Sequence, residues 1–146
     1  MWPSFIHFYI LLGYARRPVE IYSEDIDDVD PAVMEQFTVV FMTYKRHSLI
    51  KDAIALFKGI RELHRVVIIW NDVEHAPDME YDLNQYLNID KHASIVIVSP
   101  NANSLNNRLV PYEVIETECI LQIDDDTRYL TKDQIKHGFR LKYQVM

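Results

Sequence analysis

The chain has 146 residues, of which 49% are hydrophobic and 25% charged, and its net charge at pH 7 is −7. This composition is typical of one globular domain, and a chain of this size can bury a core without disulfide bonds. The acidic charge argues against binding to a nucleic-acid polymer, which depends on Lys and Arg neutralising phosphates. The single cysteine, Cys119, stands in an apolar run and is expected to be a small buried side chain.

The N-terminal part of the chain contains one apolar run and one acidic segment. Residues 5–15 are apolar but far shorter than the roughly 20 residues of a membrane-spanning helix. They also lack the preceding basic residue and the cleavage site of a signal peptide. This run predicts a buried strand or a helical turn, or reflects only how the chain begins. Residues 20–30 carry six acids and no base, which is typical of a solvated linker. We therefore expect a tail and linker over 1–35 and a domain over 36–146.

From residue 37 onward, hydrophobic periodicity predicts strands that alternate with helices. Short runs of β-branched and aromatic residues predict strands, whereas apolar residues spaced by three and four predict helices. Gln134 follows Thr131 at the spacing of a capping box, which marks the start of a helix. In chain order the predicted elements are a strand at 37–42, a helix at 47–63, a strand at 65–70, a short helix at 77–87, strands at 94–98 and 118–123, and a last helix from Thr131.

This alternation predicts an α/β domain with a mainly parallel sheet. In such sheets, ligands bind at the carboxyl ends of the strands. The loops that follow the four predicted strands are all polar, and they cover residues 43–46, 71–72, 100–108 and 124–126. Three of these loops carry groups suited to a nucleotide or a metal ion.

Three adjacent carboxylates, Asp124, Asp125 and Asp126, follow the last predicted strand and are called the acidic run below. They repel one another and need a positive group nearby. A divalent cation is the natural candidate, because hard oxygen ligands suit Mg²⁺ and Mn²⁺, which also accept phosphate oxygens. The alternative is an exposed acidic turn leading into a helix, where Asp is favoured.

Two other carboxylate motifs do not fit the acidic run. A calcium loop of the EF-hand type that starts at Asp124 requires Gly and Glu where the chain has Tyr129 and Ile135. An aspartyl-phosphate phosphatase motif requires a spacer after the second Asp, whereas Thr127 follows Asp126 directly.

Several residues in these loops could contact a nucleotide. Arg46 and Arg108 can offer a planar guanidinium to phosphate oxygens, or can form surface salt bridges instead. Tyr44 can stack on a base or cover the core. Asn71 and Asn103 can pair with a pyrimidine or ribose edge, or can serve in turns. The six histidines have no spacing typical of a metal site, which argues against histidine ligands.

The chain resembles the C-terminal glycosyltransferase domain of the exostosin and exostosin-like proteins, which build heparan sulfate. The matching segments are QFTVVFMTYKR (36–46), VVIIWN (66–71), NSLNNRLVPYEVIETECILQIDDDT (103–127) and HGFR (137–140). The likeness is stronger to the exostosin-like subgroup implicated in adding the first N-acetylglucosamine to the tetrasaccharide linker than to the chain-polymerising members. The resemblance implies a GT-A fold, a UDP-sugar donor, Mn²⁺ and retention of anomeric configuration.

Position by position, the resemblance implies a donor site. Asp124 and Asp125 would face the ribose and the sugar, and Asp126 would be a direct metal ligand. The residues expected to surround UDP are Thr43, Tyr44, Arg46, Asn71, Asn103 and Arg108.

Family members continue well past the last helix, so we expect only the N-terminal, nucleotide-sugar-binding half of a GT-A domain, without the catalytic residues of the acceptor side. Two functions follow from the resemblance. The first is an N-acetylhexosaminyltransferase acting on a glycosaminoglycan linker or oligosaccharide in the lumen of the endoplasmic reticulum or Golgi. The second is an inactive UDP-binding fragment that associates with full-length exostosin-type proteins.

Overall fold

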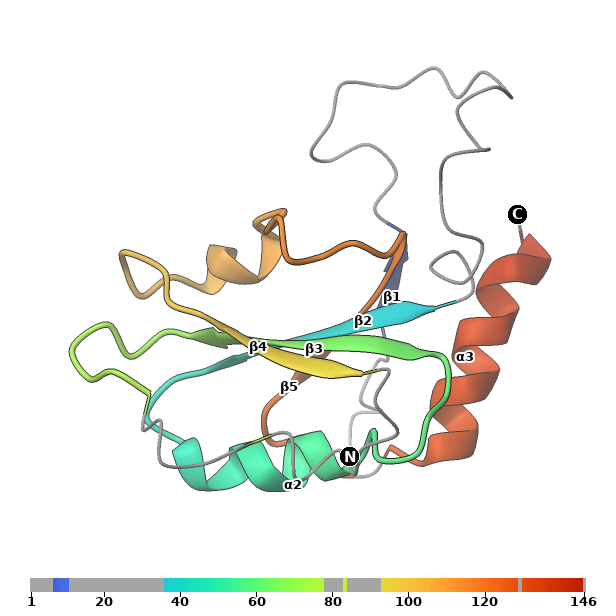
Figure 1. Ribbon diagram of the computed structural model, residues 1–146, viewed down its shortest axis with the longest axis horizontal. Coiled ribbons are helices and arrows are strands. Elements are labelled where there is room, and N and C mark those ends of the chain that lie inside the picture. Colours follow the sequence, from blue (N-terminus) through green and yellow to red (C-terminus); the bar gives the residue numbers. More distant parts are fainter. Residues whose placement is uncertain (1–6, 11–35, 78–82, 84–92, 129, 146) are drawn as a thin grey trace, which may run out of the picture.

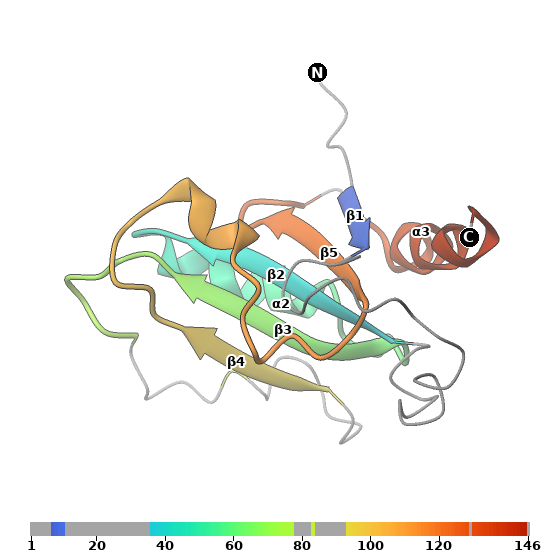
Figure 2. The ribbon, with the colours of Figure 1, turned by 90° about the horizontal axis from the view of Figure 1, so that it is seen from above.

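The computed structural model describes residues 7–10, 36–77, 83, 93–128 and 130–145. It contains a five-stranded sheet with the order β1-β5-β2-β3-β4 (Figures 1 and 2). Strands β2, β3, β4 and β5 are parallel, and β1 runs antiparallel to β5. The prediction of a mainly parallel α/β sheet is confirmed. The strands are β1 (His7–Ile10), β2 (Phe37–Thr43), β3 (Leu63–Trp70), β4 (Ser94–Val98) and β5 (Cys119–Asp124).

Strand β1 comes from the apolar run near the N-terminus, for which a strand was one of the expectations. Its backbone pairs with β5 from His7 opposite Gln122 to Ile10 opposite Cys119. The sheet therefore extends into the range expected to be a tail, and the acidic segment at 20–30 lies outside the described residues. Within the part of the chain that the structure describes, no helix is long and apolar enough to cross a membrane.

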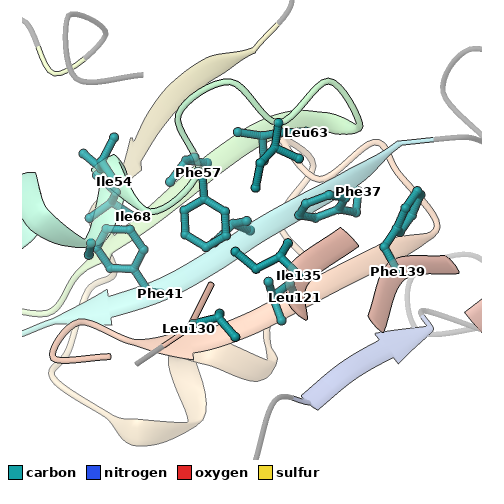
Figure 3. Close-up of a cluster of buried hydrophobic side chains, with 14 of the residues drawn as sticks. Phe37, Phe41, Ile54, Phe57, Leu63, Ile68, Leu121, Leu130, Ile135 and Phe139 are labelled. Atoms are coloured by element: carbon teal, nitrogen blue, oxygen red, sulfur yellow. The ribbon is translucent and has the colours of Figure 1, made fainter. Parts of the chain in front are cut away.

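One face of the sheet carries the larger core. Side chains alternate across a strand, so Phe37, Val39 and Phe41 of β2 point to the same face. Cys119 lies in this core, completely buried as expected. Figure 3 shows side chains of β2, β3 and β5 meeting those of the segment after β2 and of helix α3 (Lys132–Val145). The buried members of this cluster are Phe37, Val39, Phe41, Ile50, Ala53, Ile54, Phe57, Ile60, Leu63, Val66, Ile68, Trp70, Cys119, Leu121, Leu130, Ile135 and Phe139.

The opposite face of the sheet carries a smaller cluster of Val40, Val67, Ile69 and Ile120. The segment between β4 and β5 covers it with partly buried apolar side chains at 112, 114 and 115. In Figure 1 this orange segment lies on the other side of the sheet from α2 (Ile50–Ala55). Arg65 holds it in place by donating from Nη1 to the carbonyl oxygen of Val114 at 2.6 Å.

The helix predicted at 47–63 is much shorter than expected. A 3₁₀ turn, η1 (His47–Leu49), leads into α2, which ends at Ala55. The chain then continues in turns with bonds between residues three apart, and Gly59 adopts a positive φ of 76° that favours glycine. The later part of the apolar stripe is spaced only by threes, which suits three-residue turns as well as an α-helix. Phe57, Ile60 and Leu63 are therefore buried although none of them lies in a helix. Leu63 is the first residue of β3.

The last helix begins where the capping box predicted. The backbone N–H of Thr131 donates to Oε1 of Gln134 at 2.9 Å, and the N–H of Gln134 donates to Oγ1 of Thr131 at 3.2 Å. Ile135 and Phe139, four residues apart on one face of α3, are buried in the larger core. The short helix predicted at 77–87 falls mostly outside the described residues.

Replacing Thr131 with alanine should lower the free energy of unfolding by about 1 kcal/mol, because one N-terminal N–H of α3 loses its acceptor. Urea denaturation followed by circular dichroism would measure the loss. Thr131→Ser keeps the acceptor and should restore stability to within about 0.5 kcal/mol. Equal stability of the alanine variant and the wild type would contradict a stabilising cap.

Candidate functional site

The polar loops after β2, β3 and β5 meet where the parallel strands of the sheet have their carboxyl ends. This carboxyl-terminal end of the sheet is called the edge below. Thr43 at the end of β2 lies opposite Trp70 at the end of β3, and Met42 lies opposite Asp124 at the end of β5. Because these strands are parallel, their loops start side by side (Figure 2). The loop after β2 and the acidic run thus lie at the same edge, as the sequence predicted.

Arg46 connects the loop after β2 to the acidic run. Its Nη2 lies 2.6 Å from Oδ1 of Asp125, and its Nη1 lies 3.3 Å from Oδ2 of Asp126. The Arg46 side chain is half exposed, whereas the Asp125 side chain is completely buried. Part of the positive charge that the three carboxylates need therefore comes from an arginine.

Asp125 is the most unusual group at this edge. Although Oδ1 is close to Arg46, neither carboxylate oxygen makes a well-directed hydrogen bond to a described residue. Oγ1 of Thr43 is buried nearby, also without a well-directed partner. Burial raises the pKa of Asp125 above its ordinary value, and the charge of Arg46 and the nearby hydroxyl of Thr43 oppose that rise. Asp125 therefore depends mainly on the ion pair with Arg46 to compensate its charge.

Arg108 lies on the other side of the acidic run. It belongs to the 3₁₀ turn η3 (Leu105–Leu109), and its Nη1 lies 3.5 Å from Oδ1 of Asp124. Its carbonyl oxygen accepts a hydrogen bond from Nε2 of Gln122 at 2.7 Å, which ties η3 to β5. Both arginines expected to meet phosphate thus already pair with aspartates in the structure.

Asn71 holds the loop that carries η3. It is buried, its Nδ2 donates to the carbonyl oxygen of Ser104 at 3.0 Å, and its Oδ1 accepts from Nδ2 of Asn107 at 2.7 Å. Asn103 is exposed, and Asn107, which the sequence analysis did not single out, takes the position beside Asn71. The contacts of Asn71 are those of a residue that positions the loop of Arg108. A direct contact of Asn71 or Asn103 with UDP stays a prediction.

Tyr44 lies at the surface of the same edge. Its side chain is 44% exposed, and Nζ of Lys45 lies 5.2 Å from the centre of its ring. Lys45 has a φ of 53°, a left-handed conformation in a residue other than glycine, and so turns the chain sharply after β2. The ring of Tyr44 is therefore partly exposed to solvent, with the ammonium group of Lys45 over one of its faces.

A second polar cluster at this edge was missed by the sequence analysis. Nδ1 of His75 lies 3.0 Å and 3.1 Å from the two carboxylate oxygens of Asp72, and Nε2 of His47 lies 3.9 Å from Oδ2 of the same residue. The hydrogen bond from His75 lowers the pKa of Asp72. The histidines lie 28 positions apart, so no local spacing motif includes both. Their positions just after two adjacent strands were the available signal.

The acidic run offers carboxylate oxygens, the type of ligand that a hard divalent cation prefers. The Asp124 and Asp126 side chains are more than half exposed, at 65% and 59%, whereas Asp125 is buried against Arg46. Among the described residues, the oxygens of these three aspartates are not gathered into one cluster of three ligand atoms. Exposed carboxylate oxygens suit Mn²⁺ or Mg²⁺, which keep water or phosphate oxygens as further ligands. The assignment of Asp126 as the direct ligand stays a prediction.

Comparison with known protein families shows which family the chain belongs to. The profile described as the glycosyl transferase family 64 domain matches residues 37–145, from the start of β2 to the end of α3. The chain belongs to this family. The match includes the three loops described above, and it confirms the resemblance to the exostosin group found in the sequence.

Three individual relatives each match about three quarters of this chain. The Exostosin-like-3 homolog of Caenorhabditis elegans is 33% identical over 107 residues, which are 73% of this chain and 12% of that protein. Human Exostosin-like 2 is 28% identical over 76% of this chain and 33% of its own length. Rice Glucosamine inositolphosphorylceramide transferase 1 is 28% identical over 73% of this chain and 13% of its own length. The matched region thus spans no more than a third of each of these relatives.

Proposed function

We propose that this family 64 domain binds a UDP-sugar through the edge where the loops after β2, β3 and β5 meet, and that the sugar is an N-acetylhexosamine, N-acetylglucosamine in particular. The observation that carries the proposal is the contact of Arg46 with Asp125 and Asp126. In this contact a guanidinium, a group able to bind phosphate, lies beside carboxylates, which are able to bind a divalent cation. The acceptor would be a glycosaminoglycan linker or oligosaccharide, and the setting the lumen of the endoplasmic reticulum or Golgi.

Each side chain has a separate part in this proposal. Asp126, with its exposed carboxylate, would hold Mn²⁺, and Asp124 and Asp125 would face the ribose and the sugar. Arg46 and Arg108 would turn from the aspartates to the diphosphate, and Tyr44 would stack on the base. When bound, Mn²⁺ supplies positive charge to the diphosphate of the departing UDP. Thr43, Asn71 and Asn103 would complete the donor site.

Donor binding to metal and arginines does not by itself perform transfer. Transfer needs an acceptor hydroxyl held about 3–3.5 Å from the anomeric carbon. Because the contacts described above concern only the donor and the metal, we also consider a second candidate function. In that case the domain binds UDP without transferring sugar and associates with a full-length exostosin-type protein.

Calorimetric titration of UDP, with Mn²⁺ and with a chelator, tests the proposed donor site. Mn²⁺ should tighten UDP binding to the wild type by about tenfold or more, equivalent to about 1.4 kcal/mol. Asp126→Asn should remove most of that gain, because an amide is a poor ligand for a hard cation. Asp133→Asn, the same change on the exposed start of α3, should keep it.

Equal affinity of the wild type for UDP with Mn²⁺ and with chelator would contradict the metal site. An assay with labelled UDP-N-acetylglucosamine, Mn²⁺ and a linker-type acceptor then separates the two candidates. Acceptor-dependent transfer supports the enzyme, whereas Mn²⁺-dependent UDP binding without transfer supports the binding module.

A further inference from the structure

The cluster around Asp72 is separate from the acidic run in its chemistry. Its candidate ligand atoms are two imidazole nitrogens and the oxygens of two carboxylates, from His47, Asp72, Glu74 and His75. The acidic run offers only oxygens. Imidazole favours transition metals such as Zn²⁺, whereas sets of oxygens alone favour Mg²⁺ and Mn²⁺.

The geometry of the cluster is close to that of a metal site. Ligand atoms of Asp72, Glu74 and His75 lie within 4.8 Å of one another. Around a tetrahedral Zn²⁺ with bonds of about 2.0–2.1 Å, neighbouring ligand atoms are about 3.3 Å apart. The His75–Asp72 distances of 3.0 and 3.1 Å are near that separation, and the His47–Asp72 distance of 3.9 Å is slightly longer. Asp72, Glu74 and His75 thus form a cluster of three ligands, and His47 is a fourth, more distant candidate.

The surroundings of the cluster hold its ligands in place. The ring of His47 stacks on the indole of Trp70 with the centroids 4.0 Å apart. The indole Nε1 donates to the carbonyl oxygen of His75 at 2.6 Å, so one side chain positions both histidine residues. Asp72 is buried, with only 4% of its side chain exposed, whereas the side chains of His47 and His75 are 43% and 66% exposed. The carboxylate of Asp72 is thus buried, whereas both imidazoles are accessible to an ion from solvent.

We propose that His47, Asp72, Glu74 and His75 bind a transition-metal ion of the Zn²⁺ type. The ion would connect the loop after β2 to the loop after β3. It would therefore fix the loop that carries Tyr44 and Arg46, which precede His47 in the chain.

Calorimetric titration of Zn²⁺ into the whole, metal-stripped chain tests this site. His47→Ala and His75→Ala should each weaken Zn²⁺ binding at least tenfold. His137→Ala removes an exposed histidine on α3, and Asp126→Asn alters the acidic run, and both should bind Zn²⁺ like the wild type. Because an ion that binds the folded form stabilises it, Zn²⁺ should also raise the melting temperature of the wild type and of the His137 and Asp126 variants, but not of the His75 variant.

The outcomes separate this site from the donor site. Unchanged Zn²⁺ affinity in either His47→Ala or His75→Ala would overturn the proposal. Loss of Zn²⁺ binding in Asp126→Asn would move the ion to the acidic run and also overturn it. Since none of these measurements involves UDP, a failure here leaves the proposed donor function standing, and a failure of UDP binding leaves this site standing.

Discussion

Replacing Arg46 with methionine is expected to lower the free energy of unfolding at pH 7 by about 2–3 kcal/mol. Asp125 is completely buried and has Arg46 2.6 Å away. Methionine keeps much of the length of the side chain but removes the positive charge, which leaves an uncompensated buried carboxylate. Breaking a buried ion pair from one side typically costs about 3–5 kcal/mol. The half-exposed position of Arg46 lets water offset part of that cost.

A second substitution separates charge from packing in this prediction. Adding Asp125→Asn to the Arg46→Met variant removes the buried charge and should restore most of the lost stability. Arg140→Met is a matched control, because Arg140 is an exposed arginine on α3. That variant should cost less than about 0.5 kcal/mol. Urea denaturation of the four proteins at pH 7 provides the comparison, and no rescue by Asp125→Asn would refute the role assigned to charge.

The effect of Arg46→Met should also depend on pH. Burial raises the pKa of Asp125 in the folded chain above its ordinary value of 3.8. A carboxyl group with a raised pKa favours the folded state when it is protonated. Its contribution is complete below the unfolded pKa and is lost as the pH rises through the folded pKa. The difference between Arg46→Met and wild type should therefore shrink as the pH falls through the raised pKa of Asp125, and a constant difference would contradict this explanation.

Replacing Phe37 with alanine is expected to lower the free energy of unfolding by about 3–5 kcal/mol. Phe37 starts the strand at the centre of the sheet and has no exposed surface. Its ring lies 5.0 Å from that of Phe139, so it also connects the sheet to α3 (Figure 3). Alanine would leave a cavity between these two elements and remove an aromatic pair worth about 0.5–1.5 kcal/mol.

The matched control for this position is Phe37→Leu, which keeps most of the apolar volume. It should cost less than about 1.5 kcal/mol. Chemical denaturation monitored by circular dichroism measures both variants. If the alanine variant lost less than about 1 kcal/mol, α3 would not depend on this contact, and the core described above would be incorrect at that end.

Much of the fold could be predicted from the sequence because buried parallel strands are simple apolar runs. The strands predicted at 37–42 and 94–98 have almost the same bounds in the structure. The pairing of Thr131 with Gln134 located the start of α3. The region at 56–63 was predicted wrongly because a spacing of three suits helix and tight turns equally, and Gly59 directs the chain into the latter.

The candidate site was predictable as far as its position depended on strand ends. Asp124–Asp126 and Arg46 could be placed together because parallel neighbours bring their loops to one edge. Contacts between loops could not be predicted in the same way. Asn107 rather than Asn103 meets Asn71, and His47 meets Asp72, because these pairings depend on how each loop turns after leaving the sheet.

Trp70 makes this edge of the sheet observable without a label. The chain has two tryptophans, and the indole of Trp70 both stacks on His47 and donates to the backbone of His75. In a Trp2→Phe variant all tryptophan fluorescence would come from Trp70. Its emission then reports directly on any event that separates the loop after β2 from the loop after β3, so movements of these loops can be followed in real time by stopped-flow fluorescence.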